Sequence, residues 1–298
     1  MLHCRNERKY DLNLTNIKDI QELLSRNGFR FSKSMGQNFL TAQWVPERIA
    51  DEAELDENTG VLEVGPGIGC LTEQLSLRAG KVLAVEVDKA LKPVLAETLA
   101  GRGNVEVVFG DVLKNDLRTL VNEHFSGLRP VVCANLPYNI TSPLLTAFLE
   151  ADCFETITVM IQKEVAQRLC AKAGNGEYGA FTIFVNWHAE PEMLFDVPPG
   201  CFIPQPKVTS SVIRLRRRQT RPADVKDEGF FFRVVRAAFN QRRKTLVNAL
   251  TNGMSEVTRE TAESAIAECG LDLRIRGEAL DIPAFAAVAD HILEKIRG

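Results

Sequence analysis

The sequence has 298 residues, of which 45% are hydrophobic and 25% charged, as in globular proteins with one large domain and a smaller one. No apolar run approaches the ~18 residues of a membrane helix, and the first sixteen residues lack the apolar core of a signal peptide, so we expect a soluble cytoplasmic protein. The seven cysteines are scattered, odd in number and without C-x-x-C spacing, which argues against a disulfide framework or a zinc site.

The net charge of −3 hides an asymmetry along the chain. Residues 207–244 hold twelve basic and three acidic side chains, a net +9 against −12 for the remainder. Such a segment indicates one basic surface on an otherwise acidic body, and the alternative is a solvated face that binds nothing.

The first predicted element is a short amphipathic helix that Thr15 and Asn16 can cap and that Gly28 ends. Residues 29–40 mix glycine and polar residues with apolar ones and predict a loop. Residues 44–55 predict a second helix.

From residue 61 onwards, strand and helix patterns alternate. The strand patterns are apolar on both faces and each is followed by a helical pattern, which predicts a doubly wound α/β sheet. The five strand patterns occupy residues 61–65, 81–88, 105–111, 130–135 and 155–162. Residues 181–189 and 207–215 are also strand-like with no long helix between them, so we expect them to pair antiparallel at one edge.

After about residue 220 the strand patterns stop. Four helical patterns follow, at residues 228–239, 242–252, 257–270 and 283–296, behind a linker at 219–224. We therefore expect one domain of residues 1–220, of which 1–16 are unassigned, and a small all-α domain of residues 221–298.

The segment VLEVGPGIG places Gly65, Gly67 and Gly69 at the turn from the first alternating strand into its helix. Glycines at such a turn let the backbone approach a ligand at the helix N-terminus, so Gly65 and Gly67 are candidate ligand-binding residues. The dinucleotide spacing G-x-G-x-x-G fails because residue 70 is Cys, which disfavours a nicotinamide or flavin dehydrogenase. The chain has no Walker lysine motif, which removes the P-loop class.

Two acids follow the next two strands. Glu86 lies twenty-one residues after Gly65, where a carboxylate can accept hydrogen bonds from both hydroxyls of a ribose. Asp111 ends the third strand, where it could meet an adenine amine. Ligands of open α/β sheets lie across the carboxyl ends of the strands, and these residues all fall there.

The fourth strand ends in Asn135, Leu136, Pro137 and Tyr138. The Asn135 side-chain oxygen and the Leu136 carbonyl could accept hydrogen bonds from an aromatic amine, while Pro137 has no N–H and fixes that carbonyl, and Tyr138 can stack on the ring. This cluster predicts alkylation of a planar aromatic amine. Phe202, in a proline-rich loop, could form the second wall of the slot. The alternative is a proline-terminated strand with an Asn cap and a core tyrosine.

Together these motifs resemble the bacterial small-subunit (16S) ribosomal RNA adenine N6,N6-dimethyltransferase family, from about residue 17 to the C-terminus. The resemblance rests on MGQNFL, LEVGPGIGCLT, FGDVL, NLPYNITSPLL, MIQKEVAQRL, DVPPGCFIPQPKVTSSVIRL and FNQRRKTLVNAL. It implies a Rossmann-like methyltransferase sheet and no metal. It also implies S-adenosylmethionine-dependent dimethylation of two adjacent adenosines in a hairpin loop near the 3′ end of that RNA, late in subunit assembly.

The resemblance also assigns residues by position. The implied cofactor contacts are Asn38, Leu40, Gly65, Glu86, Asp111 and Asn135. Asn135 to Tyr138 and Phe202 would hold the target adenine. Residues 181–191 depart from the family wording, so Trp187 and His188 are expected to be packing or surface residues.

The RNA-binding candidates are the bases Arg216, Arg217, Arg218, Arg242, Arg243 and Lys244. The last three are expected to open a helix and to contact phosphates. The run FNQRRKTLVNAL favours the small-subunit family over the macrolide-resistance methyltransferases of the large-subunit RNA. A non-catalytic assembly or transcription factor is the alternative from another class. The expected partner is the immature small ribosomal subunit, and the expected state is a monomer.

Overall fold

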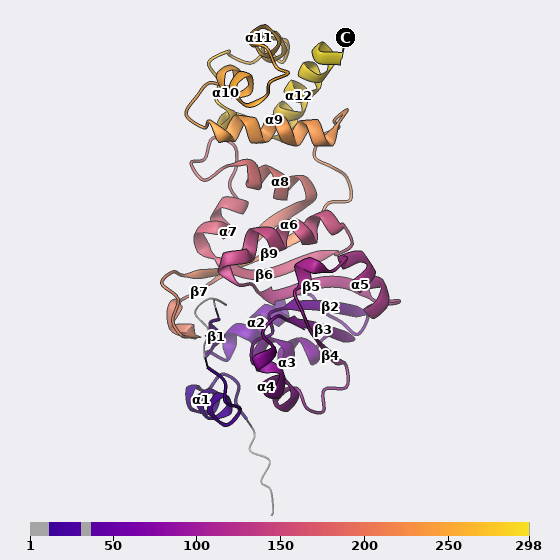
Figure 1. Cartoon of the computed structure of the whole chain (residues 1–298), viewed down its shortest axis with the longest axis vertical. Coiled ribbons are helices and arrows are strands. Elements are labelled where there is room, and N and C mark those ends of the chain that lie inside the picture. The colour runs from indigo at the N-terminus through magenta and orange to yellow at the C-terminus, as the bar shows by residue number, and fades with distance from the viewer. Residues whose placement is uncertain (1–11, 31–36, 298) are drawn as a thin grey trace, which may run out of the picture. The chain divides into compact units, whose positions relative to one another are not determined.

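The protein was analysed as a computed structural model that describes residues 12–30 and 37–297 (Figure 1). The described chain forms two compact units, one within Met1–Gln162 and Phe195–Val212, the other within Lys163–Leu194 and Ile213–Gly298. The two-domain division at residue 220 stays a prediction. No helix among the described residues is long and apolar enough to cross a membrane.

The main sheet has the strand order β4-β3-β2-β5-β6-β9-β7 within the described chain. The first five pair parallel, and their bounds are β2 Thr59–Val64, β3 Lys81–Glu86, β4 Val105–Phe109, β5 Arg129–Asn135 and β6 Thr156–Gln162. The order reverses at β2, which has β3 on one side and β5 on the other. This confirms the doubly wound α/β sheet, and the carboxyl ends at β2 form its switch point.

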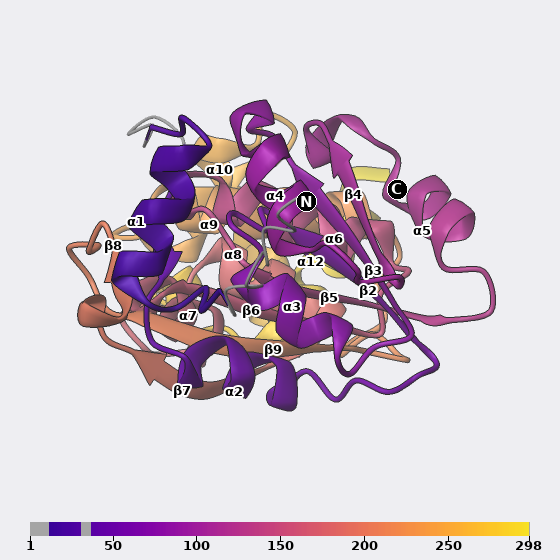
Figure 2. The same cartoon turned by 90° about the horizontal axis from the view of Figure 1, so that it is seen from below.

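The alternation of strand and helix follows the predicted order closely. The helices after β2 to β6 are α3 Cys70–Ser76, α4 Lys92–Thr98, α5 Leu117–His124, α6 Thr141–Ala151 and α7 Lys163–Leu169. Figure 2 shows α3 and α4 on one side of strands β2 to β4 and α5 on the other. Strands β2 and β3 are buried almost throughout because both of their faces are covered, whereas the edge strand β4 is half-buried.

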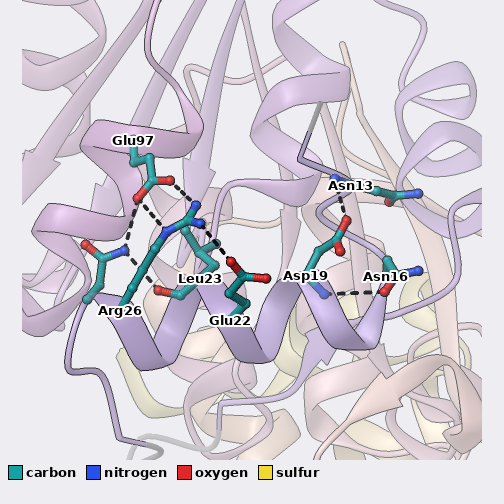
Figure 3. A network of polar contacts seen from close by, with 8 residues as sticks. Asn13, Asn16, Asp19, Glu22, Leu23, Arg26 and Glu97 are labelled. Carbon is teal, nitrogen blue, oxygen red and sulfur yellow. Dashed lines mark hydrogen bonds and ion pairs between the residues drawn. The ribbon is translucent and has the colours of Figure 1, made fainter. Parts of the chain in front are cut away.

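The predicted N-terminal helix is α1 Ile17–Arg26, capped by the Asn16 side chain, which accepts from two backbone amides. Figure 3 shows how polar contacts tie this helix to α4. Arg26 forms an ion pair with Glu97, and the Asn27 amide donates to the same carboxylate at 3.1 Å. The second predicted helix is α2 Trp44–Glu52. Residues 31–36 of the expected loop lie outside the described residues, and its end forms β1 Phe39–Leu40, which pairs antiparallel with β8 Phe202–Ile203.

The strand expected at residues 181–189 is wrong, because those residues form α8 Ala180–His188. A short run that is apolar throughout cannot be assigned to strand or buried helix by its periodicity. The Thr182 hydroxyl accepts from the Gly179 amide at 3.1 Å and thereby caps the helix start. The edge strands are instead β7 Ala189–Val197 and β9 Ser210–Arg217.

The second unit has its own core, in which α8 packs with the four predicted C-terminal helices. These are α9 Glu228–Asn240, α10 Leu246–Gly253, α11 Arg259–Glu268 and α12 Ile282–Arg297. Trp187 is 1% exposed and stacks on Phe231 with 4.6 Å between ring centroids, and His188 is also buried. Of the two roles predicted for Trp187 and His188, packing or surface, both residues have the first.

The helix expected to open with Arg242, Arg243 and Lys244 begins later, at Leu246. Thr245 is its N-cap, since the hydroxyl accepts from the Asn248 amide at 3.4 Å. The three bases therefore lie in the turn between α9 and α10.

Candidate active site

A cavity of about 300 Å³ lies at the carboxyl ends of β2, β3, β4 and β5, within the first unit. It is also lined by Gln37 to Leu40, which follow α1 in the chain. Of the residues singled out from the sequence, the cavity brings together Asn38, Leu40, Gly65, Gly67, Glu86, Asp111, Asn135, Leu136, Pro137 and Tyr138. For the residues after β2 to β5, strand ends in register account for this gathering, because every parallel strand delivers its last residues to the same edge. Asn38 and Leu40 come instead from the segment after α1.

The glycine turn adopts the backbone that its residues favour. Gly65, Gly67 and Gly69 have φ angles of 73°, 60° and 90°, a region that other residues rarely enter. A Cβ at Gly67 would also lie 3.1 Å from the Phe39 ring. The turn therefore exposes backbone to the cavity at a place where a side chain would be strained and would crowd the Phe39 ring.

Glu86 joins the second strand to this turn. The side chain is 4% exposed, and its Oε2 accepts from the Gly67 amide at 3.2 Å while Oε1 accepts from the Asp88 amide at 2.8 Å. Burial raises the pKa of this carboxyl above its usual range. Each oxygen has two lone pairs, so capacity remains for hydroxyl donors from a ligand.

Asp111 is partly committed to the fold, because its Oδ1 accepts from the Leu113 amide at 3.1 Å and caps the short helix Val112–Lys114. The cavity is also lined by Val87 and Leu113, which are 53% and 40% exposed. Sequence reasoning missed this apolar pair. The sequence feature that could have identified them is their position, since each comes within two residues after one of the acids.

Glu63 is a second residue that sequence reasoning left without a role. It lines the cavity from β2, is 1% exposed, and its Oε2 has no hydrogen-bond partner among the described residues. Burial, helped by the nearby Glu86 carboxylate and opposed by the Thr72 hydroxyl, raises the pKa of Glu63 to about 8. The sequence feature that could have identified Glu63 is an acidic residue within the otherwise apolar strand VLEV.

The end of β5 has the geometry of a fixed turn. The Leu136 amide donates to the Met160 carbonyl at 3.1 Å, and the Leu136 side chain is buried. The Pro137 carbonyl accepts from the Thr141 hydroxyl at 3.1 Å and from the Ile140 amide at 3.2 Å. The amide side chain of Asn135 has no hydrogen-bond partner in the described part of the chain, so its oxygen is available to a ligand.

The two aromatic candidates lie differently. Tyr138 lines the cavity, and its Oη lies 2.6 Å from the Ser210 hydroxyl. Phe202 is 2% exposed in β8, opposite Leu40 of β1, and is not among the described residues that line the cavity. Its place in a stacking slot stays a prediction.

The basic segment is less free than its charge suggests. Within the described chain, at least five of its twelve bases pair with carboxylates outside the segment, namely Arg214, Arg218, Lys226, Arg233 and Arg242. Arg242 donates to Glu278 at 2.8 Å and to the Gly176 carbonyl. Arg216, Arg243 and Lys244 are exposed.

The fold is shared with solved methyltransferases. The crystal structure of the 23S rRNA methyltransferase ErmE superposes with a TM-score of 0.64 at 28% identity, over 85% of this chain and 99% of that one. A dimethyladenosine transferase from Plasmodium falciparum superposes with a TM-score of 0.70 at 24% identity, over 84% and 95% of the two chains, which supports the fold. Fold and cavity together define a Rossmann-like methyltransferase.

The family can be stated more closely. The family model described as "Ribosomal RNA adenine dimethylase" matches residues 28–273. This chain belongs to the ribosomal RNA adenine dimethylase family, whose members are enzymes. Membership implies a methyl donor of the S-adenosylmethionine type and an RNA substrate.

Curated relatives match over nearly the whole chain. A ribosomal RNA small subunit methyltransferase A from Geobacillus kaustophilus (strain HTA426) is 47% identical, over 91% of this chain and 94% of the relative. One of the same name from Alkaliphilus oremlandii (strain OhILAs) is 44% identical, over 95% and 99%. The resemblance to the small-subunit family is thereby confirmed.

Proposed function

We propose that this protein transfers methyl groups from S-adenosylmethionine to the exocyclic amines of two adjacent adenosines in the 3′-terminal hairpin loop of small-subunit ribosomal RNA, during ribosome assembly. The observation that carries the proposal is the Asn135 side chain, held at the end of β5 beside the cavity without a partner in the described chain. An available amide oxygen next to a proline-fixed turn is the receptor that an aromatic amine needs.

The residues of the cavity fit the cofactor. Glu86 would accept from the ribose hydroxyls, Asp111 from the adenine amine, and Val87 and Leu113 would contact the faces of the base. Gly65 and Gly67 let backbone approach the ligand, and Asn38 and Leu40 complete the wall. The charged methionyl end would lie toward the glycine turn, where Glu63 has an oxygen without a partner among the described residues.

The chemistry is mainly orientation. S-adenosylmethionine supplies an electrophilic methyl group on a positively charged sulfur. The adenine amine is a poor nucleophile because its lone pair is delocalised into the ring. Asn135 and the Leu136 carbonyl would accept its two hydrogens and favour a tetrahedral nitrogen, so that the lone pair can form the N–C bond as the C–S bond breaks. The alkylated nitrogen then loses a proton to solvent, and no strong base is required.

The comparisons favour the small-subunit substrate. The relatives near 45% identity carry that name, whereas the solved large-subunit enzyme is 28% identical. We assign RNA and ribosome binding to residues 221–298 together with Arg216 to Arg218. The protein would work as a monomer, without a metal, in the cytoplasm where its RNA is assembled.

The direct test supplies the protein and S-adenosylmethionine to small subunits from a strain that lacks this methylation. We expect dimethyladenosine at two adjacent positions of the 3′ hairpin, mapped by primer extension and by mass spectrometry of RNA fragments. Methylation confined to large-subunit RNA would contradict the proposal, and so would particle binding without any transfer.

Phosphate binding by the α9–α10 turn predicts steep salt dependence of RNA binding. Replacing both Arg243 and Lys244 by Ala should weaken binding to immature subunits and lower the slope of log K against log salt by about 0.7–0.9 for each phosphate that is no longer neutralised. Replacing both Lys18 and Lys92 by Ala is the matched control, because it removes two exposed bases that lie in the first unit, outside the basic segment and outside residues 221–298. Equal slopes for the double variant and the control would show that this turn does not bind phosphate.

A further inference from the structure

The hydroxyls of Tyr138 and Ser210 lie 2.6 Å apart, at the short end of the range for hydrogen bonds between hydroxyls. Tyr138 lines the cavity, whereas Ser210 is fully buried. Burial raises the pKa of the Tyr138 hydroxyl above its usual range, against the opposing effect of Ser210, so the phenol keeps its proton at neutral pH. The pair is therefore a neutral hydrogen bond between the cavity wall and the core of the first unit.

We propose that Ser210 is a positioning residue for methyl transfer, which holds the Tyr138 ring in the plane against which the target adenine stacks. This inference rests on the proposed function. The hydroxyl of a tyrosine lies on the axis of its ring, so a bond at that atom prevents the ring from swinging about its Cα–Cβ bond. The bond has this effect whichever of the two hydroxyls donates.

The other end of the tyrosine is held as well. Tyr138 begins a short 3-10 helix directly after Pro137, whose carbonyl accepts from Thr141 and Ile140. Ser210 is the first residue of β9, a strand with a neighbour on each side in the main sheet. The ring is thus fixed at its backbone by one element and at its hydroxyl by another, seventy-two residues away in the chain.

Ring position matters more in this reaction than in a single transfer. The amine must be aligned once as a free amine and again after the first methyl group has made it bulkier. A ring that drifts would lower the fraction of complexes with the nitrogen in line with the methyl group, and a small misplacement of reacting atoms has a large effect on rate. The second transfer should suffer most, because the monomethylated base has fewer acceptable positions.

The adjacent residue provides a matched control. Ser211 is also fully buried in β9, and its hydroxyl donates to Asp196 Oδ1 at the same distance of 2.6 Å. Successive side chains of a strand point to opposite faces, and Ser211 is not among the described residues that line the cavity. Ser211→Ala therefore removes one hydrogen bond of a buried hydroxyl in the same strand and leaves the contact between Tyr138 and Ser210 in place.

The experiment compares full-length wild type, Ser210→Ala, Ser211→Ala, Ser210→Thr and Tyr138→Phe on immature small subunits. We measure the thermal midpoint, the Kd of S-adenosylmethionine, kcat, KM for the particle, and the ratio of monomethyl- to dimethyladenosine. For Ser210→Ala we expect kcat to fall on the order of tenfold, monomethyl product to accumulate, and cofactor Kd to stay unchanged. Ser211→Ala should lower the midpoint without changing the product ratio, and Ser210→Thr should restore dimethylation.

A double variant tests whether Ser210 acts through the tyrosine. In a Tyr138→Phe background, Ser210→Ala should have no further effect on kcat or the product ratio. If the two substitutions lower kcat independently, so that their factors multiply in the double variant, the inference is overturned. A wild-type product ratio for Ser210→Ala, on particles that active wild type methylates, would also overturn it. Wild type is assayed first on the same particles; if it transfers no methyl group to them, the proposed function falls and the inference falls with it.

Discussion

Replacing Asn135 by Ala is expected to lower kcat for methyl transfer on the order of a hundredfold, while particle binding is retained. The amide oxygen is the side-chain acceptor that holds the amine in a tetrahedral geometry, and losing one fixed polar group aimed at a reacting centre has an effect of about this size. The measurement is single-turnover transfer to immature small subunits, alongside binding of the same particles. A rate near that of wild type would remove Asn135 from the mechanism.

A second substitution at this position separates the acceptor role from simple space filling. Asn135→Asp keeps oxygen acceptors in nearly the same shape but loses both N–H donors. If acceptance orients the amine, the Asp variant should retain more activity than the Ala variant. If the Ala variant is instead the more active of the two, Asn135 acts as a hydrogen-bond donor, for instance to the cofactor. It would then not act as the acceptor for the amine.

The alternating strands and helices could be predicted because each strand is apolar on both faces and ends in a polar or glycine residue. The error at residues 181–189 has the opposite cause, since a short run that is apolar throughout also suits a buried helix. Ile183 and Trp187 are buried in a core that α8 shares with the C-terminal helices, which are distant in the chain. Local pattern does not contain that information.

The candidate site could be predicted where chemistry follows directly from strand ends, as for Gly65, Glu86 and Asn135. Ser210 could not be found this way, because its partner Tyr138 is distant in sequence and only the fold joins them. Phe202 illustrates the converse. A residue in a proline-rich loop looks available, but the pairing of β8 with β1 leaves it 2% exposed.

The basic segment shows how charge counts overstate a binding surface. Arg214 is 8% exposed at its side chain and pairs with Glu192, and Arg242 is held by Glu278. These arginines fasten elements of the second unit to one another. Exposed bases such as Arg243 and Lys244 are better candidates for binding phosphate. For this reason the salt-dependence experiment replaces those two residues.

Glu63 predicts an unusual pH dependence of stability. Its carboxyl has a pKa of about 8 in the folded protein, mainly because it is buried, against 4.5 for the free side chain. Between these values the folded state holds a proton that the unfolded state lacks, so the free energy of unfolding falls as pH rises through this window. Below it both states are protonated, and above it the loss is complete. At about 1.4 kcal/mol for each pH unit, the total is at most about 5 kcal/mol.

Glu63→Gln should abolish this dependence, because a glutamine has the shape of the protonated acid and does not titrate. Urea unfolding of the cofactor-free protein at about pH 5 and about pH 8 should show wild type losing stability relative to the variant as the pH rises. Glu57→Gln, which replaces an exposed acid, is the control. Its free energy of unfolding should change with pH in the same way as that of wild type. Burial also raises the pKa of Glu86, but both proteins share that carboxyl, so most of its effect cancels in the difference. Parallel curves for wild type and Glu63→Gln would mean that Glu63 is ionised in the fold, and that a cation or an ordered water compensates its charge.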